Sequence, residues 1–165
     1  MKEIKRLIPY AVIILVVVFI RTYIVAPVRV TGPSMENSLH NGDVLLLEKF
    51  NNSYERFDIV VVNYGDEKII KRIIGLPGET VKYVANKLYV NGELIEEPFI
   101  TDATEDFSLE NIGYDTIPAG YYFLVGDNRD NSLDSRFIGL FKESAIDGKV
   151  ELRIFPFNSI GKLNY

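Results

Sequence analysis

The sequence predicts a mostly β protein, with a single N-terminal transmembrane helix followed by an antiparallel β-sheet or barrel-like domain that carries a small inserted hairpin and loop region. Three observations predict this class. A long apolar run opens the chain, short β-branched apolar runs follow residue 40 with no helical period, and turn residues separate those runs. The length of 165 residues suits one domain beyond the helix.

The N-terminal apolar run has the length of a membrane span. Over residues 7–26 the only charged side chain is Arg21, and about twenty helical residues rise roughly 30 Å, the thickness of the hydrocarbon core of a bilayer. We expect Pro9 in the first turn of this helix, where a missing N–H is tolerated, and Tyr23 near the headgroups. A cleaved signal peptide has a shorter apolar core and a small-residue cleavage site, which "YIVAPVRV" does not offer. The sequence therefore predicts an uncleaved anchor.

Charge is distributed unevenly along the chain. Residues 1–29 carry five basic side chains and one acidic side chain, whereas residues 30–165 carry thirteen basic and twenty-two acidic ones, a net charge of −9. Basic residues precede the apolar run, so the positive-inside rule places residues 1–6 in the cytoplasm and residues 27–165 outside it. A domain of this acidity with no basic block is a poor nucleic-acid binder, and we expect no nucleic-acid partner.

Two scarce residue types exclude several chemistries. The chain has no cysteine, which excludes a cysteine nucleophile, a disulfide and a thiolate metal site. His40 is the single histidine, so a zinc site of several histidines is excluded, and we expect no metal and no cofactor. His40 lies six residues after Ser34 with no acidic partner at a telling spacing, and we interpret it as a surface loop residue.

Six apolar runs rich in β-branched residues are the predicted strands. They span residues 43–50, 57–64, 67–75, 80–90, 121–127 and 148–157. Asn91-Gly92 is a strong signal for a type I′ hairpin, and "NYGDE" and "GLPGE" indicate further turns. The acidic stretch from Glu93 to Thr116 is expected to be rich in loops, within an inserted subdomain at about residues 82–119.

The stretch "GPSMENSL", residues 32–39, places a serine just beyond the predicted membrane span. Gly32 and Pro33 favour a tight backbone whose N–H groups can converge on an oxyanion. Most serines in loops are turn residues, so Ser34 taken alone does not indicate a nucleophile.

The stretch "EKIIKRIIGLPGE", residues 67–79, contains a lysine in a predicted strand. Side chains alternate along a strand, which places Lys71 on one face with Ile69 and Ile73, and Arg72 on the other face. Burial disfavours the charged ammonium and lowers its pKa from about 10.4, so that the neutral amine can act as a general base. A lysine on a solvated strand edge is the alternative interpretation.

The stretch "GDNRDNSLDSR", residues 126–136, is dense in groups that form hydrogen bonds. Asp134 and Arg136 can pair through two hydrogen bonds, and Ser132 is small enough to bond an amine. Together the three stretches supply the nucleophile, the base and the orienting groups that a serine hydrolase requires. A Ser-Lys pair is the arrangement that this sequence can build.

At these residues the chain resembles the type I signal peptidases, specifically the bacterial membrane-anchored Ser-Lys class in its compact Gram-positive form. "PSM" with Leu39, "GD" at 42–43, "KRIIGLPGE" and "GDNRDNSLDSR" occur in the order of that family, from the anchor to about residue 155. The resemblance implies a serine endopeptidase at the outer face of the cytoplasmic membrane. It would remove N-terminal signal peptides from secreted preproteins through an acyl-enzyme, with a preference for small residues at −1 and −3.

The resemblance also implies roles for individual residues. Ser34 would be the nucleophile and Lys71 the general base. The backbone N–H of Ser34 would bind the oxyanion; Gly32 stands where some members of the family add a serine hydroxyl, so the second donor is open. The residues expected to support the base are Ser132, Asp134, Arg136, Arg72 and Asp127. The residues expected to line the substrate cleft are Val28, Val30, Met35, Leu39 and Ile70.

The partners implied by this role are secretory preproteins, the phospholipid bilayer and a protein-export channel. Two other functions are considered. A self-cleaving repressor-type Ser-Lys protease is soluble, bound to DNA through a separate domain and without the 126–136 loop, and the anchor and the acidity argue against it. A membrane-anchored β-domain could bind a partner without catalysis, but a paralogue that had lost catalysis would change Ser34 or Lys71, and both are present.

Overall fold

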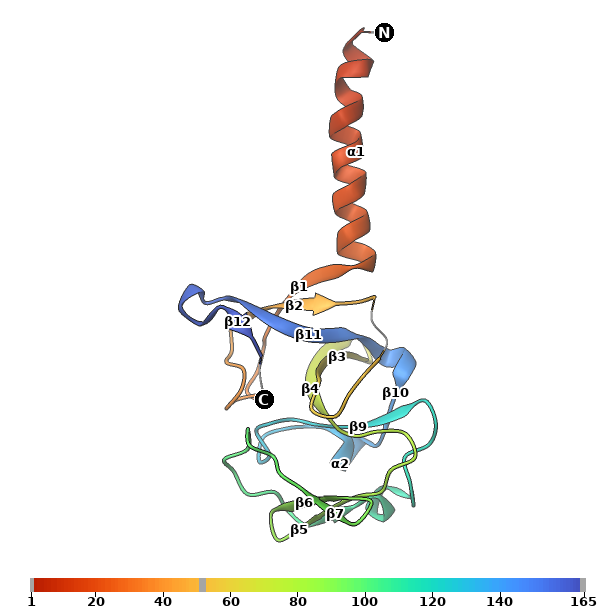
Figure 1. The fold of residues 1–165 in the computed structure, drawn as a ribbon, viewed down its shortest axis with the longest axis vertical. Helices are drawn as coiled ribbons and strands as arrows, with labels where there is room; N and C mark the ends of the chain where they lie inside the picture. The colour runs from red at the N-terminus through yellow and green to blue at the C-terminus, as the bar shows by residue number, and fades with distance from the viewer. Residues whose placement is uncertain (1, 51–52, 164–165) are drawn as a thin grey trace.

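A computed structural model describes residues 2–50 and 53–163 of the chain. It places one long helix above a body of two antiparallel sheets (Figure 1). Residue 1 of the predicted cytoplasmic segment and residues 51–52 and 164–165 of the predicted outer domain lie outside the described residues.

Helix α1 (Lys2–Tyr23) projects from the body as a single rod (Figure 1). Its segment Arg6–Tyr23 is long and apolar enough to cross a membrane by length and composition, and none of it is buried in the protein. Two expectations about this helix were wrong. Pro9 lies inside the helix, because the helix begins at Lys2, and the helix ends at Tyr23 rather than at Ala26. The chain leaves the helix there because the next residues pair as a strand.

The larger sheet is antiparallel, as predicted. Its strands, in spatial order, are β1 (Val25–Arg29), β2 (Val44–Glu48), β11 (Ile146–Phe155), β3 (Ile59–Tyr64), β4 (Glu67–Gly75), β9 (Tyr121–Val125) and β10 (Phe141–Lys142), with β12 (Gly161–Lys162) paired to β11. The sheet is open: β1 and β10 stand at opposite ends of this order, and no pairing joins them in the described part of the chain. The expected barrel-like form is therefore a folded sheet and not a closed barrel.

The smaller sheet lies at the end of the body opposite α1 (Figure 1). Its strands, in spatial order, are β7 (Glu93–Ile95), β6 (Lys87–Val90), β5 (Val81–Val84) and β8 (Phe107–Ser108), and the 3-10 helix η1 (Leu109–Ile112) follows β8. Asn91 and Gly92 form the predicted hairpin turn, with φ of 52° and 83°. The predicted strand 80–90 is instead a hairpin that turns at Ala85 and Asn86, with φ of 48° and 65°. An alanine rarely adopts positive φ, so this turn has no clear signal in the sequence.

Three apolar clusters form the core. One joins the small sheet to the large sheet through residues such as Tyr83 and Phe123. A second lies under the turn that follows β1 and includes Met35 and Leu39. A third covers part of the other face of the large sheet and includes Val60. The remaining short helices are α2 (Ser135–Ile138), η2 (Glu143–Ala145) and η3 (Phe157–Ser159). The large sheet is therefore buried on both faces around β4, which brings polar residues of β4 into the interior.

Candidate active site

Ser34 lies in a tight turn directly after β1. Gly32 enters this turn with φ of 89°, a conformation that favours glycine, and the Glu36 N–H donates to the Pro33 carbonyl at 2.9 Å. Met35 and Leu39 are buried in the core beneath the turn. These buried side chains anchor the turn and leave Ser34 half-buried at its surface.

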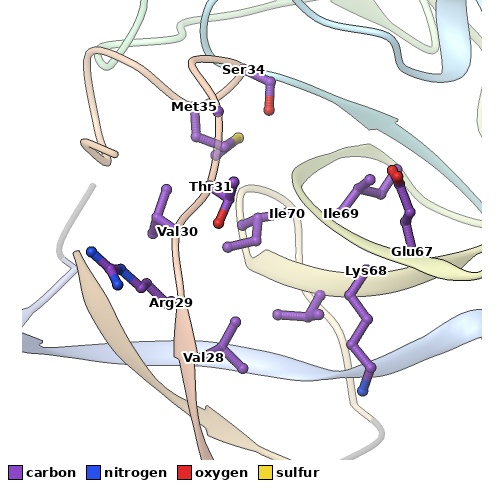
Figure 2. A pocket seen from close by; sticks show the side chains of 12 residues that line it. Val28, Arg29, Val30, Thr31, Ser34, Met35, Glu67, Lys68, Ile69 and Ile70 are labelled. Carbon is purple, nitrogen blue, oxygen red and sulfur yellow. The ribbon is translucent and has the colours of Figure 1, made fainter. Parts of the chain in front are cut away.

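A cleft of about 390 Å³ opens beside Ser34. Figure 2 shows Ser34 at one end of this cleft and Val28 toward the other. One wall is the chain from Val28 through Met35, the other is the first part of β4, and Val61 also lines the space. The lining residues are Val28, Arg29, Val30, Thr31, Gly32, Ser34, Met35, Val61, Glu67, Lys68, Ile69 and Ile70.

The backbone of β4 offers a free edge along this cleft. On one side β4 pairs with β3 over residues 67–72, but on the other side its pairing with β9 begins only at Arg72. Residues 67–71 therefore have one edge without a strand partner in the described part of the chain. A peptide in the cleft can add to such an edge as an extra strand.

Lys71 comes directly after Ile70, the last residue of β4 that lines the cleft. It is buried, with 3% of its surface exposed. This burial lowers the pKa of the amine from 10.5 to about 8, against the opposing effect of the Asp134 and Asp127 carboxylates. The Arg136 cation lowers the pKa further. No hydrogen bond or ion pair joins the Lys71 amine to another described residue. Lys71 therefore has the burial and the lowered pKa that the sequence argument required of a general base.

The 126–136 loop packs against the Ser34 turn. The Asn128 N–H donates to the Ser34 carbonyl at 3.1 Å. Gly126 is pressed between the two segments: a Cβ added there would overlap the Ser132 hydroxyl and approach the Ser34 carbonyl oxygen to 2.5 Å. The Ser132 hydroxyl is buried without a hydrogen-bond partner among the described residues. Gly126 therefore lies between Ser34 and Ser132, and any other residue at this position would displace one of these neighbours.

Two buried ion pairs stiffen this region. Arg72 donates two hydrogen bonds to Asp127, at 2.8 Å and 2.6 Å, and both side chains are fully buried. Asp134 accepts from Arg136 at 2.9 Å and 3.0 Å. Asp134 also accepts from the Gly126 N–H at 3.0 Å. Charge-assisted bonds with two contacts fix orientation as well as distance, so both pairs define the shape of the loop.

The predicted site residues fall into two groups in the structure. Four of the five expected cleft residues line the cleft: Val28, Val30, Met35 and Ile70. Leu39 does not line it, because its side chain is fully buried in the core below. The second group lies in and against the 126–136 loop and comprises Arg72, Asp127, Ser132, Asp134 and Arg136.

His40 is an exposed residue, as interpreted from the sequence, but it does have an acidic partner. Its Nδ1 lies 2.7 Å from a Glu36 carboxylate oxygen, with 61% and 43% of the two side chains exposed. The second oxyanion donor, left open by the sequence, involves Gly32, and in the structure its N–H donates to the Asn41 side chain at 3.3 Å.

Sequence reasoning missed several residues around the site. Arg29 and Thr31 line the cleft on either side of the predicted Val30, and Glu67, Lys68 and Ile69 line it directly before the predicted Ile70. Their closeness to predicted residues in the sequence was the available signal. Arg129 lies within the loop motif and is buried, but its acidic partner Glu97 is 32 residues away. No local pattern connects those two residues.

Comparisons with known proteins agree with this geometry. Residues 4–155 match the family described as signal peptidase, peptidase S26. The chain is 39% identical over 167 residues to signal peptidase I S of Bacillus subtilis (strain 168), covering 93% of this chain and 91% of that protein. It is 41% identical over 164 residues to a signal peptidase I of Bacillus amyloliquefaciens, covering 92% and 89%.

A solved structure is also similar. The crystal structure of a signal peptidase I from Enterococcus faecalis V583 superposes with a TM-score of 0.56 at 37% sequence identity, covering 59% of this chain and 96% of that chain. The family match covers most of the chain, and the relatives are similar over nearly their whole length. This chain therefore belongs to the signal peptidase family, peptidase S26.

Proposed function

We propose that the protein is a serine endopeptidase that removes signal peptides from secreted preproteins, with Ser34 as nucleophile and Lys71 as general base. The observation that carries the assignment of these residues is the cleft itself. It is lined by two stretches of extended chain, ends at Ser34, and has a buried lysine of lowered pKa next along one wall. Membership of the peptidase family supports the same chemistry.

In this mechanism the neutral Lys71 amine takes the proton of the Ser34 hydroxyl as its oxygen attacks the scissile carbonyl. The resulting ammonium gives that proton to the leaving amine, which departs as the new N-terminus of the mature protein. The amine then activates water, which hydrolyses the acyl-enzyme and restores Ser34. With a pKa of about 8, about a tenth of the amine is neutral at pH 7.

The oxyanion is assigned to the backbone N–H of Ser34, which donates to no other described residue. Because the Gly32 N–H is engaged by Asn41, we do not assign it as a second donor. The preprotein would bind as a strand along the free edge of residues 67–71, with its side chains against Val28, Val30 and Ile70. These apolar walls favour small side chains at −1 and −3 of the signal peptide.

The geometry also supports a position at the membrane surface. We propose that residues 1–6 are cytoplasmic, that α1 crosses the bilayer, and that the body lies outside as a catalytic domain with the small sheet as its subdomain. The connection between β11 and β12 lies at the end of the body from which α1 leaves (Figure 1). Phe155, the last residue of β11, and Phe157 and Ile160 in the connection are 45%, 79% and 55% exposed, which suits contact with lipid. Preproteins would emerge from an export channel at this outer surface, so the protein would associate with the channel there.

The test is cleavage of a purified preprotein with an Ala-x-Ala signal by the full-length protein in detergent. Wild type is compared with Ser34→Ala and Lys71→Ala, each checked for folding by circular dichroism, and the new N-terminus is identified by mass spectrometry. We expect wild type to cut after the second alanine and both variants to be inactive and folded. Substantial activity in Lys71→Ala would refute the assigned base. No cleavage by wild type would favour the non-catalytic binding domain.

A further inference from the structure

One irregular segment of the small subdomain, residues 97–104, touches all three stretches that build the site. Glu97 and Thr104 bond the 126–136 loop through Arg129. The Phe99 ring lies 3.8 Å from the Arg72 guanidinium, beside Lys71 in β4. Asp102 accepts from the Asn37 side chain, within the turn of Ser34, at 3.2 Å. A segment outside the catalytic motifs therefore braces each of them.

The strongest of these contacts is a buried ion pair. Arg129 donates to Glu97 at 2.6 Å and 3.3 Å and to the Thr104 hydroxyl at 2.9 Å, with 1% of the Arg129 side chain and 9% of the Glu97 side chain exposed. Tyr83, fully buried in β5, donates its hydroxyl to the same Glu97 at 3.1 Å. The pair thus joins the small sheet rigidly to the loop.

The same guanidinium reaches the centre of the site. Its Nε donates to the Gly126 carbonyl at 3.1 Å. Gly126 separates Ser34 from Ser132 with no room for another atom. Arg136 adds a bond from its guanidinium to the Arg129 carbonyl at 2.8 Å. The Arg129 side chain is therefore bonded directly to the residue that spaces the two serines.

We propose that the Glu97–Arg129 ion pair positions the reacting groups of this site. It holds the Gly126 carbonyl, and Gly126 in turn sets the spacing between Ser34 and Ser132. Neither member of the pair touches the cleft, so both are positioning residues rather than catalytic ones. This inference rests on the proposed function, because the spacing matters only if the reaction takes place there.

The charges around Lys71 make the proposal distinguishable from a direct electrostatic effect. The groups that act on the Lys71 amine are Asp134, Asp127 and Arg136. Neither Glu97 nor Arg129 is among them. If Glu97→Gln loosens the loop, water reaches the amine and its pKa rises toward that of a free lysine. An unpaired Arg129 cation acting directly would shift the pKa in the opposite direction.

The experiment compares Glu97→Gln with Glu79→Gln in the full-length protein in detergent, using the preprotein assay. Glu79 is a matched control: it pairs with Arg56 at 2.6 Å and is also mostly buried. It ends the 67–79 stretch and accepts from the Leu76 N–H there, but in the described part of the chain no hydrogen bond or ion pair joins its side chain to Lys71, the Ser34 turn or the 126–136 loop. Thermal unfolding, kcat, KM and the pH profile of kcat/KM are measured for each. Thr104→Val, which removes one bond to Arg129 and keeps the ion pair, serves as a milder second variant.

We expect Glu97→Gln to lower kcat by about 10- to 100-fold, the usual effect of a misplaced catalytic group, with KM changed less than about threefold. The rising limb of its pH profile should move to higher pH. Thr104→Val should show the same changes more weakly. Glu79→Gln should lose thermal stability but keep the kcat and the pH profile of wild type. The proposal is overturned if Glu97→Gln folds and has the same kcat and pH profile as Glu79→Gln. If Glu97→Gln does not fold, the same result for folded Thr104→Val overturns it. Activity in Lys71→Ala would refute the assigned base instead, and no cleavage by wild type would refute the proposed function.

Discussion

Lys71 and Arg72 are adjacent in β4 and both are buried, yet only the arginine has an ion-pair partner at hydrogen-bond distance. Arg72 is held by two bonds to Asp127, whereas the Lys71 amine bonds to no described residue. A buried cation with a bonded carboxylate keeps its charge, while a buried amine without one is shifted toward its neutral form. The strand thus carries a structural cation and a potential base at successive positions, with their side chains on opposite faces of the sheet.

The first prediction concerns pH. Because the Lys71 amine must be neutral to accept a proton, kcat/KM should rise with pH and level off above about 8, the pKa that burial gives it. The measurement is kcat/KM for an Ala-x-Ala preprotein from pH 6 to about 10.5, the unshifted lysine range, with circular dichroism at each pH as the folding control. A rate that begins to rise only near the pKa of a free lysine would contradict the assignment.

The second prediction is that the buried Lys71 amine lowers the free energy of unfolding at neutral pH. The folded-state pKa of Lys71 is about 8 and the unshifted value is 10.5, so unfolding takes up a proton between these pH values. The free energy of unfolding therefore rises with pH through that window, and below pH 8 the folded state carries a penalty of about 3 kcal/mol. Lys71→Met should remove it, giving an inactive protein that is more stable at pH 7.

Thermal unfolding in detergent at pH 7 and near pH 10.5 checks this, with the exposed Lys142→Met as control. The gain of Lys71→Met over wild type should be largest at pH 7 and shrink at the higher pH, whereas Lys142→Met should follow wild type at both. A Lys71→Met variant that unfolds below wild type at pH 7 would show that the amine contributes favourable contacts instead.

The third prediction concerns specificity. Ile70 lines the cleft and is nearly buried, so Ile70→Ala should enlarge the space for the substrate side chain at −3. Relative kcat/KM for preproteins with valine against alanine at −3 should rise about tenfold, since a methylene or two in an apolar pocket contributes this much discrimination. Ile73→Ala is the control, because Ile73 is fully buried in another cluster and does not line the cleft. An equal change in both variants would exclude a role for Ile70 in selection.

The fourth prediction tests contact with lipid. The chain has no tryptophan, so Phe157→Trp introduces a single reporter at the exposed end of the β11–β12 connection. In vesicles of anionic phospholipid its emission should shift to shorter wavelength and be quenched by bromine-labelled acyl chains, because the indole prefers the interface. Leu94→Trp, in β7 at the opposite end of the body (Figure 1), should remain as in detergent. Identical spectra from the two variants would exclude the contact.

Much of the fold could be predicted because it is encoded locally. The apolar helix and the strands follow from hydrophobic runs, and the Asn91-Gly92 turn follows from residues that tolerate positive φ. The Ala85-Asn86 turn could not be predicted in this way, because packing of the small sheet imposes a conformation that the alanine does not favour. Leu39 was expected in the cleft from its place in a motif, but the fold buries it in the core.

The available chemistry follows from the sequence: a serine directly beyond the anchor, a lysine between isoleucines, no cysteine and a loop rich in hydrogen-bonding groups. Tertiary structure alone decided that the lysine is buried, that a cleft ends at Ser34, and that Glu97 meets Arg129 across 32 residues. The physical reason is that propensity and periodicity act between neighbours in the chain, whereas desolvation and ion pairing depend on which distant segments pack together.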